Sequence, residues 1–278
     1  MVRIVVFVVK VLKNVMEKIN HILKKLGPGL LFAGAAIGVS HLVQSTKAGA
    51  EFGFGLIWAL IIANLFKYPF FQYGPRYALS TGENMLVGYK KLSRYILLLY
   101  FLITLATMFS IQTAVTIVTA GIANSITGGI ISTELWTVFI TVFCSLVLII
   151  GKYNTLDKII KYIIIILAIS TITATLMAGF EFESTISFEQ IFPKDSVGII
   201  FLIAFMGWMP APLDVSVWHS IWALEKKKTL KNYSLENSIF DFNIGYLGTA
   251  FLGICFISLG YFVMNESGES FSESAGVF

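Results

Sequence analysis

Apolar stretches of about 20 residues, separated by short polar segments, fill most of the chain. A helix needs about 20 mostly apolar residues to cross the roughly 30 Å of hydrocarbon in a bilayer. The pattern predicts an all-α polytopic membrane protein whose transmembrane domain covers residues 26 to 264. The seven expected spans are residues 28 to 48, 53 to 77, 95 to 122, 133 to 151, 158 to 179, 197 to 223 and 240 to 264.

The basic residues predict the orientation of these spans. Cytoplasmic loops are enriched in Lys and Arg, and with seven spans every basic loop of this chain falls on the same side of the membrane. The clusters are Arg76, Lys90, Lys91 and Arg94; Lys152, Lys158 and Lys161; and Lys226, Lys227, Lys228 and Lys231. The opposite loop, residues 179 to 195, is acidic. We expect a plasma (inner) membrane protein with a cytoplasmic amino terminus.

The two ends of the chain differ from the spans. Residues 1 to 25 combine a short apolar run with five lysines, and no small-residue cleavage site follows. This pattern predicts a cytoplasmic amphipathic segment lying at the membrane surface, with a misassigned start codon as the alternative. Residues 265 to 278 carry three glutamates and predict an extracytoplasmic tail.

The composition excludes several function classes. Of 278 residues, 56% are hydrophobic and only 13% are charged, against roughly 25% charged in soluble domains. The net charge of +4 lies where anionic lipid headgroups attract it, so the lipid bilayer is the expected partner and no nucleic acid is needed to explain it. Cys144 and Cys255 are far apart, and no nucleotide-binding loop or catalytic constellation occurs. We expect neither an enzyme nor a resident cofactor.

Two of the expected spans are interrupted by residues that disfavour a helix. The first carries Gly38 followed by Ser40 and His41, and the sixth carries Pro210 and Pro212 shortly before a carboxylate. Proline removes a backbone donor and restricts the residue before it. Paired interruptions five spans apart are typical of transporters that bind substrate between broken helices.

Other interpretations of these residues stay open. Gly34 and Gly38 have the spacing of a close helix-packing face. Asp214 fits the first turn of a new helix, where a carboxylate cap is favoured. His41 fits an interior histidine, a proton carrier or a transition-metal ligand.

Lys67 lies in the middle of the second span. Insertion scales put a central lysine at about +2.5 to +3.5 kcal/mol, so it should face the protein interior and have a partner. We expect that partner to be Asp214 or a backbone carbonyl of a broken helix. A lysine paired only for packing is the alternative.

The stretches G-P-G-L-L at residues 27 to 31 and A-G-A-E-F-G-F at residues 48 to 54 resemble the Nramp family of proton-coupled divalent metal transporters. Weaker resemblance occurs at 60 to 65, 72 to 73, 81 to 82, 209 to 210 and 219 to 220. The resemblance implies two inverted five-span repeats, unwound first and sixth spans, and alternating access. The chain would then hold the first repeat and two spans of the second, with about three or more spans missing.

The metal site departs from the family pattern. Where the family has Asp-Pro-Gly-Asn, this chain has Gly38, Val39, Ser40 and His41, and loss of the buried carboxylate is costly for a dication. The resemblance makes Met209 the soft ligand of the family. His219, followed by serine, corresponds to a family histidine in proton movement, although its spacing differs.

We therefore expect an Nramp-related secondary transporter, a symporter of a metal cation, with a remodelled substrate site. The site residues are Gly38, Ser40, His41, Met206, Met209 and Asp214, with the carbonyls of Ile37 and Met206 as further oxygen donors. The metal ligands among them are His41, Met209 and Asp214, while His219 and Lys67 are the proton or charge residues. The alternatives are a transporter of another small solute or anion, with Lys67 as a fixed charge, and a non-transporting protein.

Overall fold

The computed structural model describes residues 26–265, and over this range the chain folds into helices without strands. The predicted all-α fold class is confirmed. In chain order the elements are α2 (Pro28–Ala36), η1 (Ser40–Ser45), α3 (Thr46–Phe52), α4 (Ile57–Thr81), α5 (Met85–Leu92), α6 (Arg94–Ile126), α7 (Thr133–Glu181), α8 (Ser196–Trp208), α9 (Asp214–Thr229), α10 (Leu235–Gly260) and η2 (Tyr261–Asn265), where η denotes a π-helix. The predicted amphipathic segment and the tail beyond residue 265 lie outside the described residues.

Among the described residues, three helices are long and apolar enough to cross a membrane unaided: α6, α7 and α10 continued through η2. A fourth span is possible from α2 with η1 and α3, a pair bent by 51° at the break between Ala36 and Ser40. The count of seven spans remains a prediction. It depends on α4, on α8 with α9, and on α7 crossing twice.

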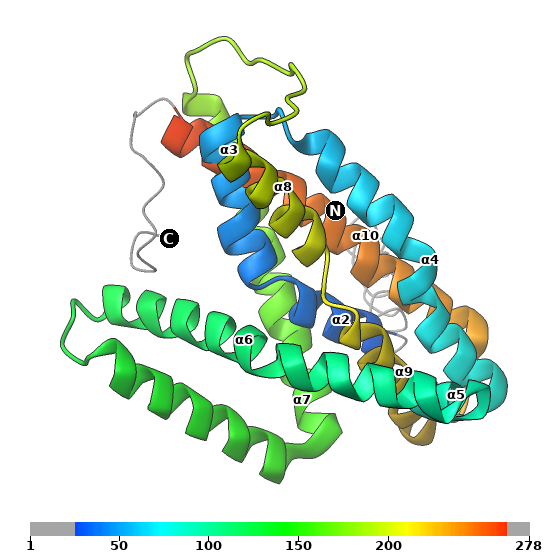
Figure 1. The fold of residues 1–278 in the computed structure, drawn as a ribbon. Coiled ribbons are helices and arrows are strands. Elements are labelled where there is room, and N and C mark those ends of the chain that lie inside the picture. Colours follow the sequence, from blue (N-terminus) through cyan, green and yellow to red (C-terminus); the bar gives the residue numbers. More distant parts are fainter. Residues whose placement is uncertain (1–25, 266–278) are drawn as a thin grey trace, which may run out of the picture.

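The helix α7 contains a sharp break at Lys152, whose φ is 50°. At 1.5 Å per residue, a straight helix of 49 residues would be about 74 Å long, more than twice the bilayer core. Figure 1 shows the two parts of α7 running in different directions, the first alongside α6. The sequence predicted two spans here, 133 to 151 and 158 to 179.

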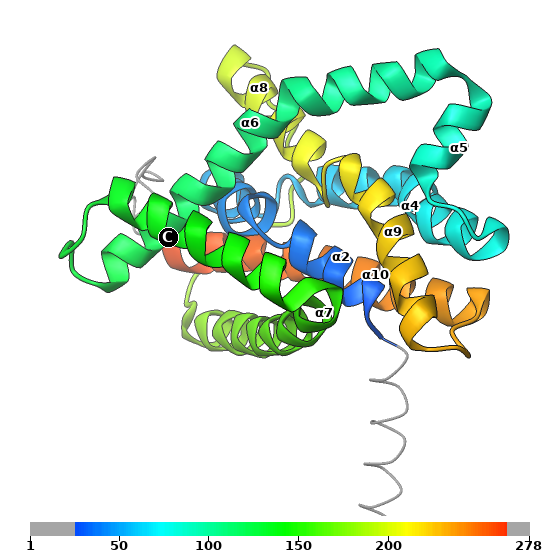
Figure 2. The same cartoon turned by 90° about the horizontal axis from the view of Figure 1, so that it is seen from below.

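The helix α10 lies at the centre of the molecule and packs against α2, α3, α4 and α7 (Figure 2). One close crossing is at Gly29, where an added Cβ would lie only 1.9 Å from the carbonyl oxygen of Asp241. The α6–α7 hairpin extends away from this centre, and its outward side chains, such as Phe109 and Phe143, are more than half exposed. Such a surface is suited to lipid.

Candidate functional site

The break between α8 and α9 leaves backbone carbonyls without helical partners. In a continuous helix the carbonyl of Met206 would accept from residue 210, but Pro210 has no N–H. After Met209, which is in an extended conformation, the chain forms no helix again until Asp214. The sequence M-G-W-M-P-A-P thus creates a group of free carbonyl oxygens at the carboxyl end of α8, where the helix dipole favours positive charge.

Lys67 of α4 fills this group of carbonyls. Its Nζ donates to the carbonyl oxygens of Met206 at 2.8 Å, Gly207 at 2.7 Å and Met209 at 2.6 Å. An ammonium group has three N–H donors, and all three are used here. A neutral amine would have only two donors for three acceptors, so the geometry fits the charged form. The prediction that a carbonyl of a broken helix is the partner of Lys67 is confirmed.

The break after α2 is built around His41, which is fully buried. Its Nε2 lies 3.0 Å from the carbonyl oxygen of Thr249 in α10, and its Nδ1 lies 2.8 Å from Oγ of Ser40. The Ser40 hydroxyl donates a hydrogen bond of 2.6 Å to the carbonyl of Ala36, which is the last residue of α2. Gly38 has open space beside it, because an added Cβ would meet nothing within 4 Å.

Asp214 is the first residue of α9 and is buried. Its Oδ1 accepts a hydrogen bond of 2.9 Å from the hydroxyl of Thr104 in α6. This contact joins the second broken helix to α6. Asp214 therefore has a tertiary partner in addition to its favourable position in the first turn of a helix.

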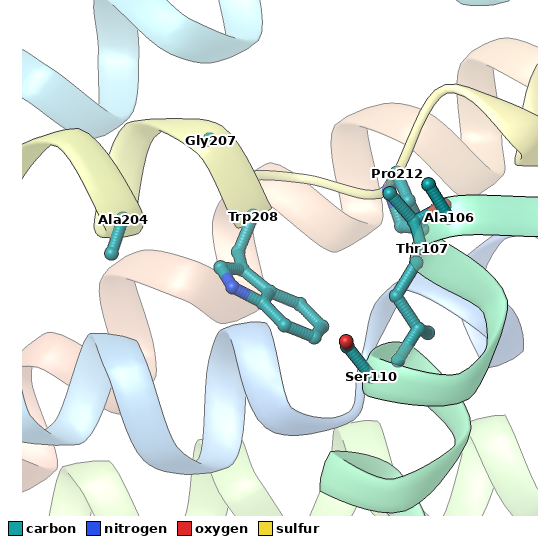
Figure 3. A pocket seen from close by; sticks show the side chains of 8 residues that line it. Ala106, Thr107, Ser110, Ala204, Gly207, Trp208 and Pro212 are labelled. Carbon is teal, nitrogen blue, oxygen red and sulfur yellow. The ribbon is translucent and has the colours of Figure 1, made fainter. Parts of the chain in front are cut away.

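A cavity of about 380 Å³ lies between α6 and the break. Its lining includes Gly207, Trp208 and Pro212 from the break, and Thr107 and Ser110 from α6. Figure 3 shows the indole of Trp208 and the hydroxyl of Ser110 pointing toward one another across this space. Since Gly207 also accepts from Lys67, the cavity adjoins the group of free carbonyls.

The remaining predicted residues lie in apolar surroundings. Met209 is fully buried in a core cluster with residues of α4 and α8, and Met206 packs against the same cluster. His219 is fully buried beside the rings of Phe32, Trp222 and Phe242. Within the described part of the chain, neither of its ring nitrogens has a hydrogen-bond partner.

The three predicted metal ligands have different partners. His41 contacts Ser40 and Thr249. Met209 lies in an apolar cluster, and Asp214 accepts from Thr104. Over residues 26–265 no group of three or more His, Cys, Asp or Glu side chains could hold a metal ion.

Sequence reasoning assigned no role to Asp241 and did not pair Thr104 with Asp214. Asp241 is fully buried in α10 and accepts from the backbone amides of Gly27 and Gly29 at the start of α2. A carboxylate in an apolar segment was the available signal. The sequence could not show that Asp241 contacts Gly27 and Gly29, because more than 200 positions separate it from them.

The helical fold, the exposed apolar surface and the two broken helices define a polytopic α-helical membrane protein. The family model described as natural resistance-associated macrophage protein-like (Nramp) matches residues 29–272. The chain belongs to the Nramp family, which confirms the resemblance inferred from residues 27 to 54.

An uncharacterized protein of Pasteurella multocida (strain Pm70) is 35% identical over 249 residues. The match covers 88% of this chain and 57% of the relative. The chain thus spans little more than half the length of this curated relative.

Proposed function

We propose that the protein is a secondary transporter that moves a divalent metal cation across the membrane, bound between the two broken helices. The observation that carries this proposal is the group of carbonyls of Met206, Gly207 and Met209, which already surrounds a positive charge. Carbonyl oxygens replace the hydration shell of a cation in channels by the same chemistry. Membership of the Nramp family supports the same class of substrate.

Negative charge and polar groups near the break support a cation further. Asp214 supplies a buried carboxylate, and Thr107 and Ser110 supply hydroxyl oxygens in the adjoining cavity. In this proposal Ser40, His41 and the open space at Gly38 form the opposite wall of the site, and Met209 is a soft ligand. His219 carries the coupled proton of a symporter in the plasma (inner) membrane, with the amino terminus in the cytoplasm.

The engaged state of Lys67 weighs against an anion as substrate. A fixed positive charge that binds an anion needs a free donor, but all three donors of Lys67 point at backbone carbonyls. The alternative of an anion transporter therefore requires Lys67 to break these bonds first.

The test is uptake of Mn²⁺ and Mg²⁺ into vesicles that carry the full-length protein, measured with and without an inward proton gradient. We expect saturable Mn²⁺ uptake above that of empty vesicles, stimulated by the gradient. Uptake of neither ion by correctly folded protein would contradict the proposal and favour another solute or a non-transporting role. Uptake without any effect of the gradient would contradict only the proton coupling.

A further inference from the structure

We infer that the ammonium group of Lys67 is a tethered competitor of the transported cation, which binds the carbonyls of Met206, Gly207 and Met209 only after Lys67 has left them. This inference rests on the proposed function and adds a specificity-determining residue to it. In the structure the ammonium group of Lys67 occupies the position among the carbonyls that the transported cation would take.

The contacts on the α8 side define a single cation site. The three N···O distances lie between 2.6 and 2.8 Å, so the oxygens converge on one point. Backbone carbonyls present a negative partial charge without a titratable group. Because Pro210 removes the helical donor for Met206, these oxygens need another positive or donor group whenever Lys67 is absent.

Two cations cannot share this point. A metal ion among the same oxygens would lie within contact distance of the ammonium, and two positive charges at that distance repel one another. Lys67 is only half-buried, and its flexible four-carbon stem lets the charged end move while the backbone of α4 stays in place. The side chain is thus able to withdraw from the site.

The cavity beside the break provides the approach for the incoming ion. Gly207 and Trp208 lie at the end of α8 and line the cavity (Figure 3), and the carbonyl of Gly207 is one of the three that accept a hydrogen bond from Lys67. The hydroxyl group of Ser110 on α6 faces the same space, which Thr107 also lines. A cation entering there would reach the carbonyls from the side of α6, whereas Lys67 reaches them from α4.

Competition has a measurable consequence. When only a fraction of the protein molecules has a free site, the apparent affinity for the ligand falls in proportion to that fraction. If Lys67 leaves the carbonyls free about one tenth of the time, its removal raises the apparent affinity for the cation about tenfold. A purely structural lysine has the opposite effect, because its loss would disorder the break and weaken binding.

The first experiment measures the KM for Mn²⁺ uptake by full-length protein in vesicles, for wild type and for Lys67→Gln, Lys67→Arg and Lys90→Gln. We expect Lys67→Gln to lower the KM about tenfold, because the amide carries no charge that repels the metal ion or competes with it for the carbonyls. Lys67→Arg keeps a cation there and should retain a KM near that of wild type. Lys90, exposed on α5, controls for the loss of one positive charge and should leave the KM unchanged.

The second experiment uses Lys67→Ala, which opens the space of the side chain. Ethylammonium should then inhibit Mn²⁺ uptake competitively, because it restores an ammonium group among the carbonyls, whereas wild type should be insensitive. Thermal unfolding and gel filtration in detergent show whether each variant is folded. If Lys67→Gln does not fold, the inhibition of Lys67→Ala by ethylammonium decides the question, and if neither variant folds, the inference is rejected in favour of a structural lysine.

The outcomes separate this inference from the proposed function. Uptake by wild type with an unchanged or higher KM in folded Lys67→Gln would overturn the inference alone. Uptake by both, with a lower KM in Lys67→Gln, would support the inference and the proposed function together. No uptake by any folded variant would overturn both.

Discussion

The carboxylate of Asp241 in α10 accepts a hydrogen bond of 2.9 Å from the backbone N–H of Gly29 in α2, although 212 positions separate the two residues. It also accepts from the amide of Gly27 at 3.0 Å and from the hydroxyl of Tyr233 at 3.0 Å. The first amides of a helix have no intrahelical partners, and an anion is favoured at that end. Asp241 thus attaches the start of the first broken helix to the centre of the fold.

We predict that Asp241→Asn lowers the free energy of unfolding by about 1 to 3 kcal/mol, because a buried group that accepted three hydrogen bonds keeps only one accepting oxygen. The new amide N–H₂ group would face the backbone donors of Gly27 or Gly29. Thermal unfolding of the purified protein in detergent measures this. Glu236→Gln, exposed in the first turn of the same helix, should change stability by no more than about 0.5 kcal/mol. Equal effects of both variants would rule out a special role for Asp241.

A second prediction concerns Gly29, where α2 crosses α10. In Gly29→Ala the new Cβ would lie 1.9 Å from the backbone carbonyl of Asp241, and a backbone atom cannot move aside as a side chain can. We expect α2 and α10 to separate, with a loss of about 3 kcal/mol or more, seen as a sharp fall in the yield of folded protein. Gly248→Ala is the matched control on α10, since its Cβ meets nothing within 4 Å and alanine favours the helix. A normal yield of Gly29→Ala would disprove the tight crossing.

A third prediction concerns pH and the short helix α5, which lies between the predicted second and third spans. Lys91 donates to Oε1 and Oε2 of Glu83 at 2.8 and 2.6 Å. This hydrogen bond lowers the pKa of Glu83 below its ordinary 4.5 and raises the pKa of Lys91 above its ordinary 10.5. The stabilisation by Glu83 is therefore complete above pH 4.5 and is lost as the pH falls through its folded pKa. The stabilisation by Lys91 is complete below pH 10.5 and is lost at higher pH.

Amide hydrogen exchange of residues 85 to 92, corrected for intrinsic rates, tests this pair. We expect exchange in α5 to accelerate below pH 4.5 in wild type, while α10 stays protected. Both side chains of the pair are partly exposed to solvent, so the change should be confined to α5. Lys91→Gln should remove this pH dependence and give rapid exchange at neutral pH as well. An identical pH profile in the variant would show that the pair does not hold α5.

The two broken helices were predictable from the sequence because their causes are local. Pro210 and Pro212 remove backbone donors wherever the chain places them, and the partner of Lys67 followed from the cost of an unpaired lysine inside a membrane. The carbonyls freed by the prolines need donors, and an ammonium group inside a membrane needs acceptors. A contact between Lys67 and the broken helix satisfies both. The short helix α5 was missed, because its eight residues lie in a segment that the sequence pattern marked only as a basic loop.

The contacts of Asp241 and Asp214 were not predictable, because they depend on how distant helices cross. Thr104 and Asp214 are 110 positions apart and come from α6 and α9. Several hydroxyl groups of α6 were equally good candidates as partners from the sequence. Only the tertiary arrangement shows which hydroxyl faces the carboxylate, and which of the seven predicted spans are continuous helices.

Asp214 provides the most direct test of the remodelled site. We predict that Asp214→Asn reduces kcat/KM for Mn²⁺ by about 100-fold or more, because the proposed site relies on this buried carboxylate, whose loss removes several kcal/mol from the holding of a dication. The amide keeps the size of the side chain and still accepts from Thr104, so folding should be preserved. Glu225→Gln removes a carboxylate from the other end of α9, where it pairs with Lys228, and should leave transport unchanged. Wild-type flux in Asp214→Asn would show that the carboxylate does not bind the substrate.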